Sequence, residues 1–359
     1  MDWTRLLSVQ DHWIFPMRAD GVESDEAVPV PAEPSAAPPP VSGRLAQPGQ
    51  PPRPSQHRGS LLYAGPSPHS GHHLDAFIRC PQYWAYRYGY GLLTSSGSLD
   101  PYGRLNARGK GSMGHIGLAH FFRRAQAEQE GTDPEEFLPW PEAVAVYAWE
   151  QDAKEEAGCT AWSDFVPVAI QTVSAFLDHR FCIRQMRLRV LSVEGVIDFH
   201  PIFGFPHTRS VDLVVQHDDG RVYYWDHKFT ALPITARVRQ RYAIDGQFLD
   251  YQIHGPRAWG DRWGGAWANL IRWPNKDQVD LDLNRVPPAP AAVAARPVAV
   301  QRAFQERAFL QAAGTGPWDW PKRLSELICV TPYGLCAGYE LCAHGVEASP
   351  RHARLTVLD

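Results

Sequence analysis

Apolar residues recur at helical spacing in four segments between about residues 72 and 180. These segments cover about 72–90, 110–128, 141–156 and 164–180, and Pro81 interrupts the first of them. Strand-like alternation then predicts one strand at about 186–199 and two more within 209–229. The chain therefore changes from helical to strand-like patterning near its middle.

Helical spacing returns after these strands. It covers about 238–254 and 299–313, on either side of a short predicted strand at about 266–273. Helices, then a small sheet, then helices again indicate an α/β domain with helical elaboration.

Two proline-rich stretches interrupt this pattern. The first, about 20–70, contains too little apolar surface to fold, so we predict a mostly disordered segment over 1–70 and one domain over 71–359. The apolar residues among the first 15 positions leave two readings open, a docking motif for a protein partner and a poorly ordered terminus. The second stretch, VPPAPAAVAARP from Val286, predicts a further loop or linker.

Composition and charge narrow the class of protein. The 359 residues are 44% hydrophobic, which is enough for a sizeable core. The net charge of −4 gives no overall basic field, so any contact with nucleic acid would depend on a local basic groove. No apolar run approaches the roughly 20 residues of a membrane span, and the first residues do not resemble a secretory signal. We therefore expect a soluble cytoplasmic protein without a membrane partner.

A predicted hairpin sets two acidic residues opposite each other. The sequence Asp-Asp-Gly at 218–220 suits a three-residue loop, which pairs His217 with Arg221. This register places Asp212 opposite Asp226, and directly opposed residues share a face with Cβ atoms about 4.5–5.5 Å apart. The hairpin therefore predicts two carboxylates at one point of the sheet.

A lysine belongs to the same predicted face, because Lys228 lies two residues after Asp226. Opposed carboxylates repel, and a divalent cation between them removes the repulsion. Oxygen ligands suit Mg²⁺ or Mn²⁺ better than zinc, and a lysine alongside can hold a water or stabilise charge on a phosphate. The hairpin alone leaves open a second interpretation, an ordinary ion pair at a strand end beside a solvent-facing Asp212.

The hairpin motif resembles the metal site of the PD-(D/E)XK nuclease superfamily, in which an Asp on one strand faces a (D/E)-x-K on the next. The matching residues are VDLVV and WDHK, although Arg209-Ser210-Val211 stands where relatives often carry Gly-x. Two further motifs are similar to those of RecB-like members, Gly111-Ser-Met-Gly-His115 and Gln247-Phe-Leu-Asp-Tyr251. The resemblance implies a restriction-endonuclease-like core, a small mixed sheet flanked by helices.

The resemblance also implies a function for each matching residue. The implied ligands of Mg²⁺ or Mn²⁺ are His115, Asp212, Asp226 and the backbone carbonyl of His227. Lys228 would orient and activate the attacking water, while Gln247 and Tyr251 would position the lysine and the substrate. The implied activity is a DNA nuclease, an exonuclease on single-stranded DNA or free ends, in repair, recombination or CRISPR adaptation. A non-cleaving DNA-binding or assembly subunit with the same fold stays an alternative.

Four cysteines form a separate pattern. Cys329, Cys336 and Cys342 cluster in a Cys-rich tail, and Cys80 precedes a proline far upstream. This pattern resembles the iron–sulfur subset of RecB-like nucleases, which includes AddB-type subunits, CRISPR-associated exonucleases and phage-type relatives. The resemblance implies a 4Fe-4S cluster that joins the two ends of the domain. Structural zinc and buried thiols stay open as alternatives, although zinc sites usually use close cysteine pairs, which this chain lacks.

Basic residues precede the predicted Gln247 helix. Arg237, Arg239 and Arg241 should lie near the active face, where they would either contact DNA phosphates or form a solvated charged surface. Glu194, on the strand before the hairpin, is a candidate for the metal face outside the motifs.

Overall fold

The computed structural model describes most of the chain between positions 71 and 342. The described residues are 71–89, 98–99, 102–155, 158–180, 188–275, 278–313, 319–322, 329–331, 334–336 and 342. All of them belong to one compact unit, Ser42–Asp359. The prediction for residues 1–70 lies outside the described part of the chain.

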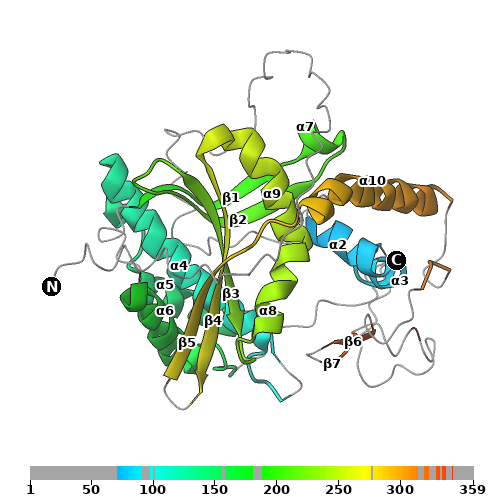
Figure 1. Cartoon of the computed structure of the whole chain (residues 1–359). Helices are drawn as coiled ribbons and strands as arrows, with labels where there is room; N and C mark the ends of the chain where they lie inside the picture. The colour runs from blue at the N-terminus through cyan, green and yellow to red at the C-terminus, as the bar shows by residue number, and fades with distance from the viewer. Residues whose placement is uncertain are drawn as a thin grey trace. The chain divides into compact units, whose positions relative to one another are not determined.

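A five-stranded mixed sheet in the order β1-β2-β3-β4-β5 forms the centre of this unit (Figure 1). The strands are β1 (Arg189–Asp198), β2 (Thr208–Gln216), β3 (Val222–Thr230), β4 (Trp263–Asn275) and β5 (Gln278–Arg285). Neighbouring strands are antiparallel except β3 and β4, which are parallel. Parallel neighbours require a long crossover connection, and here helices form it. The predicted α/β architecture with a small mixed sheet is confirmed, whereas β5 was not among the predicted strands.

The β2–β3 hairpin has the predicted register. The backbone N–H of His217 donates to the carbonyl of Arg221 at 2.8 Å, and Gly220 adopts a φ of 81°, which favours glycine. The paired residues run from Gln216–Val222 to Leu213–Trp225. Continued by one step, this register sets Asp212 across from Asp226.

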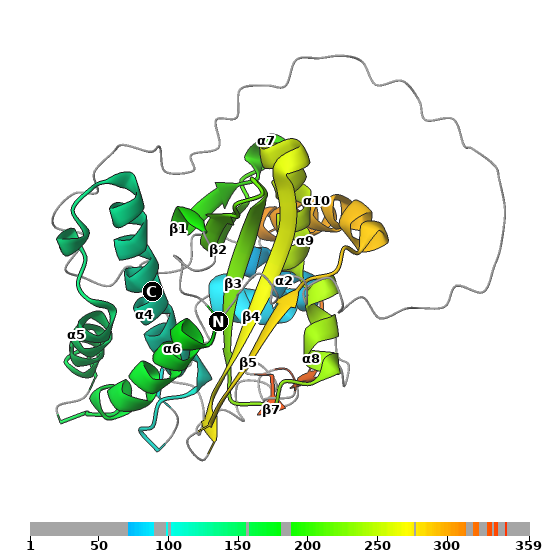
Figure 2. The same ribbon diagram turned by 60° about the vertical axis from the view of Figure 1, so that its left-hand side comes forward.

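Two helices, α4 (Ala107–Glu130) and α6 (Val166–Arg180), cover one face of the sheet, and α5 (Trp140–Asp152) packs against both of them (Figure 2). The side chain of Asn106 caps the start of α4, and Gly131 ends it in the left-handed region at a φ of 70°. Phe122 of α4 and Phe176 of α6 belong to the buried cluster that the sheet forms with these helices. The long helix α4 is therefore fixed at both ends and along its apolar face.

The opposite face is covered by α8 (Ala236–Arg241) and α9 (Gly246–Trp259), which lie in the crossover between β3 and β4 (Figure 2). Asp245 caps α9 by accepting from the backbone N–H of Gln247 at 3.0 Å. Phe248 and Tyr251 of α9 are buried against this face together with Tyr224 of β3. The cap and these aromatic contacts set the register of α9 on the sheet.

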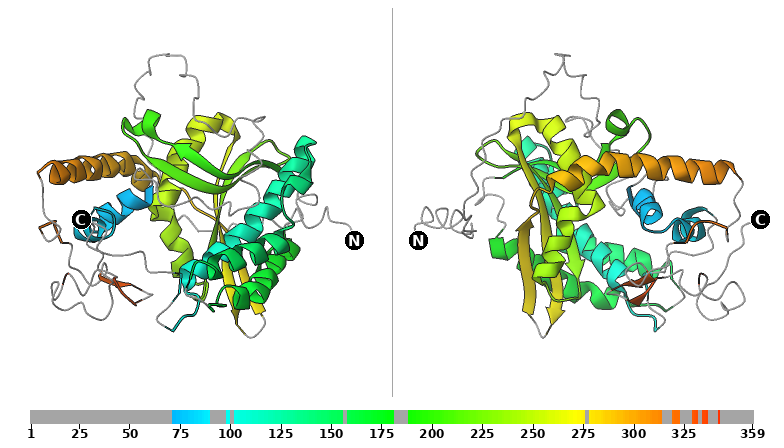
Figure 3. Two further views of the ribbon diagram at one scale, coloured as in Figure 1. Left: turned by 180° about the vertical axis from the view of Figure 1, so that it is seen from behind. Right: turned by 45° about the vertical axis from the view of Figure 1, so that its right-hand side comes forward.

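A further layer consists of α2 (Gly71–Arg79), α3 (Pro81–Trp84) and α10 (Pro290–Ala312), and Figure 3 shows α10 beside α2. Pro81 ends the first predicted helical pattern as expected, because Cys80 is extended and Pro81 starts α3. A short π-helical turn, Ala85–Gly89, follows α3. Further short elements include α7 (His200–Phe203), β6 (Val330–Thr331) and β7 (Gly334–Leu335).

The predicted loop or linker from Val286 is wrong from Pro290 onward. Helix α10 begins at that residue and continues through Pro297. Proline is tolerated in a first helical turn, and the alanines that follow have the strongest helix propensity. Proline content alone therefore does not predict a loop where alanine-rich helical sequence follows. Among the described residues, no helix is long and apolar enough to cross a membrane.

Candidate active site

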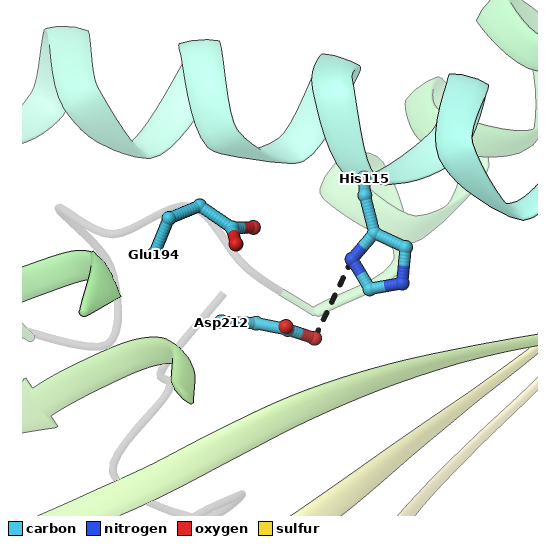
Figure 4. A group of neighbouring side chains, drawn as sticks. All are labelled: His115, Glu194 and Asp212. Carbon is cyan, nitrogen blue, oxygen red and sulfur yellow. Dashed lines mark ion pairs between the residues drawn. The ribbon is translucent and has the colours of Figure 1, made fainter. Parts of the chain in front are cut away.

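Three side chains from three elements converge beneath α4: His115 of α4, Glu194 of β1 and Asp212 of β2 (Figure 4). One ligand atom of each lies within 4.8 Å of the others, and His115 Nδ1 is 3.5 Å from Asp212 Oδ2. An imidazole nitrogen with two carboxylates, all half-buried, is a donor set that fits Mg²⁺ or Mn²⁺. His115 and Asp212 were predicted from the motifs, whereas Glu194 was a candidate outside them.

The approach of His115 to the sheet depends on a neighbouring glycine. A Cβ atom at Gly114 would lie only 2.2 Å from the ring of Phe229 on β3. Phe229 in turn packs against the His115 ring with a centroid separation of 5.4 Å. Gly111, the first residue of the predicted motif, would meet nothing within 4 Å if it carried a Cβ. The glycine that this packing requires is therefore Gly114.

The register of β1 on β2 brings Glu194 to the site. Val193 pairs with Leu213 and Gly195 pairs with Val211, so Glu194 lies across from Asp212. Among the described residues other than glycine, Glu194 alone has a positive φ, 51°. Burial, and then the charges of Asp212 and Asp226, raise the pKa of Glu194 well above its usual value.

Asp226 and Lys228 form the second half of the site. Lys228 Nζ pairs with Asp226 Oδ2 and also donates to Gln247 Oε1 at 2.8 Å. Gln247 Nε2 donates to Asp226 Oδ1 at 2.6 Å and to the hydroxyl of Tyr251 at 2.7 Å. The hydroxyl of Tyr251 donates to the carbonyl of Ser210 at 2.6 Å. The structure thus brings together four of the five predicted residues on β3 and α9, the exception being the side chain of His227.

These contacts determine the charges of the pair. Burial raises the pKa of Asp226, opposed by the attraction of Lys228 and reinforced by the repulsion of Asp212. Burial by itself would favour the neutral amine of Lys228, but the attraction of Asp226 and Asp212 outweighs it and raises the pKa of Lys228. The lysine is therefore an ammonium group near neutral pH, with a donor available for an oxyanion or a water.

The side chain of His227 lies away from these residues. It is 2% exposed and stacks on Phe122, with ring centroids 5.9 Å apart. Burial, and then the charge of His115, lower its pKa to about 3. Its backbone N–H donates to Asp212 Oδ2 at 2.7 Å, which orients that carboxylate. A ligand role for its backbone carbonyl stays a prediction.

A buried ion cluster fixes α9 from behind. Asp250 is fully buried and accepts from Arg209 Nε at 2.7 Å, from Arg296 Nε at 2.9 Å and from His207 Nε2 at 3.0 Å. Both arginines also donate to Asp75 of α2, at 2.6 and 2.8 Å. The cluster therefore joins α2, β2, α9 and α10.

The role of Asp250 is not among the predictions made from the sequence. The available signal was an acid on the apolar face of the predicted Gln247 helix, together with Arg209 at a position where relatives often carry Gly-x. Burial acts to raise the pKa of Asp250, but the charge of Arg209 and the hydrogen bond of His207 outweigh it, and the pKa is lowered. The carboxylate therefore stays ionised inside the protein.

Three of the four predicted cluster cysteines influence the fourth, Cys342. Burial, and then Cys80, Cys336 and Cys329, raise the pKa of Cys342 to about 11, while Lys322 opposes the shift. The backbone N–H of Cys336 donates to the carbonyl of Cys329 at 2.7 Å. No three of these thiols come within 4.8 Å of one another, although all four cysteines are among the described residues. A tetrahedral zinc, with Zn–S bonds of about 2.3 Å, would need them closer.

The three predicted DNA-contacting arginines are exposed on α8. Arg239 pairs with Asp282 of β5, and Arg241 Nη2 donates to the hydroxyl of Tyr242 at 3.2 Å. Arg237 is the first arginine of the helix and is exposed. The structure places all three in the segment just before α9, and their contact with DNA stays a prediction.

Comparison with known proteins identifies one family. The model of the PD-(D/E)XK nuclease superfamily matches residues 68–317. This match includes His115, Glu194 and the hairpin and ends before the cysteine-rich tail. No curated protein matches the chain.

Proposed function

The chain belongs to the PD-(D/E)XK nuclease superfamily, and we propose that it is a metal-dependent deoxyribonuclease with its centre at the β2–β3 hairpin. The observation that carries this proposal is the convergence of Asp212 and His115 on one side with the Asp226–Lys228 pair on the other. Family membership makes hydrolysis of phosphodiester bonds the expected reaction, and the gathered side chains supply what that reaction needs.

The residues that would hold Mg²⁺ or Mn²⁺ are the predicted ligands His115, Asp212 and Asp226, together with the carbonyl of His227. A divalent cation bound there would supply an acidified water and charge neutralisation at the phosphate. The ammonium group of Lys228, held between Asp226 and Gln247, orients the water and donates to the developing negative charge. Gln247 and Tyr251 keep the carboxylate of Asp226 and the lysine in fixed orientations.

The proposed substrate is single-stranded DNA with a free end. The RecB-like motifs at His115 and at Gln247–Tyr251 support this choice, and so do the exposed arginines at 237, 239 and 241 next to the start of α9. Comparing linear with circular single-stranded DNA in the presence of Mn²⁺ tests it. Cleavage of linear DNA alone supports exonuclease action, and equal cleavage of both contradicts it.

The proposed second cofactor is a 4Fe-4S cluster held by the thiolates of Cys80, Cys329, Cys336 and Cys342. The electrostatic influence of Cys80, Cys329 and Cys336 on Cys342 supports it, and four thiolates are the usual ligand set of such a cluster. The test is metal analysis and visible absorption of protein purified without oxygen. Iron with a broad visible band supports the cluster, and zinc alone contradicts it.

The nuclease activity itself is tested by mutation of the β3 pair. Asp226→Ala and Lys228→Ala should each lower cleavage of linear DNA with Mn²⁺ by at least about 100-fold. Lys154→Ala, at an exposed lysine near the end of α5, is the control and should keep the wild-type rate. Wild-type rates in both β3 variants would contradict the assignment. Metal-independent DNA binding by a wild-type protein that does not cleave would favour the alternative, a non-cleaving subunit.

A further inference from the structure

A third carboxylate belongs to the site, besides the two acids of the hairpin. Glu194 shares with His115 and Asp212 the arrangement in which one ligand atom of each lies within 4.8 Å of the others. All three side chains are half-buried, so solvent still reaches them. Figure 4 shows the carboxylate of Glu194 beside the imidazole of His115 and that of Asp212 below it.

The backbone that presents Glu194 adopts an unusual conformation. Its φ of 51° lies in the region that residues with a Cβ atom rarely adopt, within a strand that otherwise pairs regularly with β2 here. Arg123, eight residues after His115 on α4, donates from Nη2 to the carbonyl of Val193 directly before this position. The same helix therefore carries His115 and contacts the backbone next to Glu194, which the strand register sets across from Asp212.

Charge around the three acids is incompletely balanced. Lys228 pairs with Asp226, so this ammonium group offsets one of the three negative charges. The guanidinium group of Arg123 interacts electrostatically with Glu194, but its hydrogen bond goes to a backbone carbonyl. Carboxylates at this separation repel each other, and a divalent cation between Glu194 and Asp212 converts the repulsion into attraction.

Asp226 is engaged differently from the other two acids. Its oxygens contact Lys228, Gln247 and Tyr251. Among the residues that the structure describes, the three donor atoms that lie close together belong to His115, Glu194 and Asp212, and Asp226 is not one of this group. We propose that Glu194 is a direct ligand of the divalent cation, which it holds together with His115 and Asp212. This inference rests on the proposed metal-dependent function and adds a ligand that the motifs do not contain.

The test is a titration of Mn²⁺ into the full-length protein, in which the electron paramagnetic resonance signal reports unbound Mn²⁺. Glu194→Gln keeps the size of the side chain and removes its charge, so Mn²⁺ should bind at least about tenfold more weakly than in the wild type. Glu136→Gln, at an exposed glutamate, is the matched control and should bind as the wild type does. Wild-type affinity in Glu194→Gln would overturn the inference.

Asp212→Asn separates this inference from the proposed function. If Asp212→Asn loses Mn²⁺ binding and Glu194→Gln keeps it, the cation site exists without Glu194, and only the inference fails. If Mn²⁺ binding requires Glu194 but the wild type cleaves no DNA, the inference holds and the nuclease proposal fails. Circular dichroism establishes folding of each variant. If Glu194→Gln does not fold, Glu194→Asp is used, because it shortens the side chain by one methylene and moves the carboxylate away from the cation. Its Mn²⁺ affinity should then be at least about tenfold weaker than that of the wild type, and wild-type affinity would overturn the inference.

Discussion

The side-chain amide of Gln247 donates to Oδ1 of Asp226 at 2.6 Å, across the gap between α9 and β3. The other end of the same amide accepts from Lys228 at 2.8 Å. One glutamine therefore fixes the orientation of both the acid and the lysine. Groups that orient a catalytic or ligand residue in this way usually contribute about 10–100-fold to activity or metal affinity.

Replacing this amide should impair the site while the fold is kept. In Gln247→Leu, Asp226 and Lys228 retain their ion pair but lose their shared orientation, so DNA cleavage with Mn²⁺ should fall by about 10–100-fold. The melting temperature should change little, because Gln247 lies at the start of α9. Gln240→Leu, at an exposed glutamine on α8, is the control. Unchanged cleavage by Gln247→Leu would show that the amide does not position the pair.

The buried cluster around Asp250 should be important for stability. Asp250→Asn leaves Arg209 and Arg296 without their fully buried counter-charge, and breaking such a pair typically costs about 3–5 kcal/mol. Urea denaturation should show this loss, and Asp261→Asn, at an exposed aspartate after α9, should be nearly neutral. A loss below about 1 kcal/mol in Asp250→Asn would contradict the role of the cluster.

The same carboxylate predicts a pH dependence of folding. Its pKa in the folded protein is lowered, so its contribution to stability is complete above the pKa of about 3.9 in the unfolded chain. That contribution is lost as the pH falls below this value, because the unfolded chain takes up the proton first. The wild type should therefore lose stability below about pH 4 more steeply than Asp250→Asn does. Parallel pH profiles of the unfolding free energy would contradict this assignment.

Alanine substitutions at Gly114 and Gly111 of α4 should change the stability of the protein in opposite directions. In Gly114→Ala the new methyl group would meet the Phe229 ring, and overpacking of this kind typically costs about 1–3 kcal/mol. Gly111→Ala is the matched substitution one helical turn earlier, where nothing lies within 4 Å, so it should stabilise α4 by up to about 1 kcal/mol. Thermal unfolding distinguishes the two, and equal effects would show that Gly114 is not held by this contact.

Local patterns were sufficient to predict the part of the site that lies close together in the sequence. The Asp-Asp-Gly loop determines the register that brings Asp212 opposite Asp226, and helical periodicity places Gln247 next to Tyr251. These relationships depend on turn geometry and on the helical repeat, which a single sequence contains.

The remaining contacts depend on tertiary structure. The bond from Arg296 to Asp75 joins residues 221 positions apart, and no local pattern indicates such a pairing. Glu194 reaches the site because β1 pairs with β2 in a register that sets it across from Asp212, and its backbone φ is positive; the sequence of β1 alone specifies neither feature. The start of α10 was missed for a different reason, because its prolines hid a strong alanine helix signal.

The central claim is that the hairpin acid Asp212 belongs to a metal-dependent nuclease site. The most direct measurement is single-turnover cleavage of linear single-stranded DNA, with and without Mn²⁺, by the wild type and by Asp212→Asn. Asp218→Asn, an exposed acid of the same hairpin, serves as the control. The account predicts Mn²⁺-dependent cleavage by the wild type and the control and a loss of at least about 100-fold in Asp212→Asn. Wild-type cleavage by Asp212→Asn, or cleavage that does not depend on a divalent cation, would contradict it.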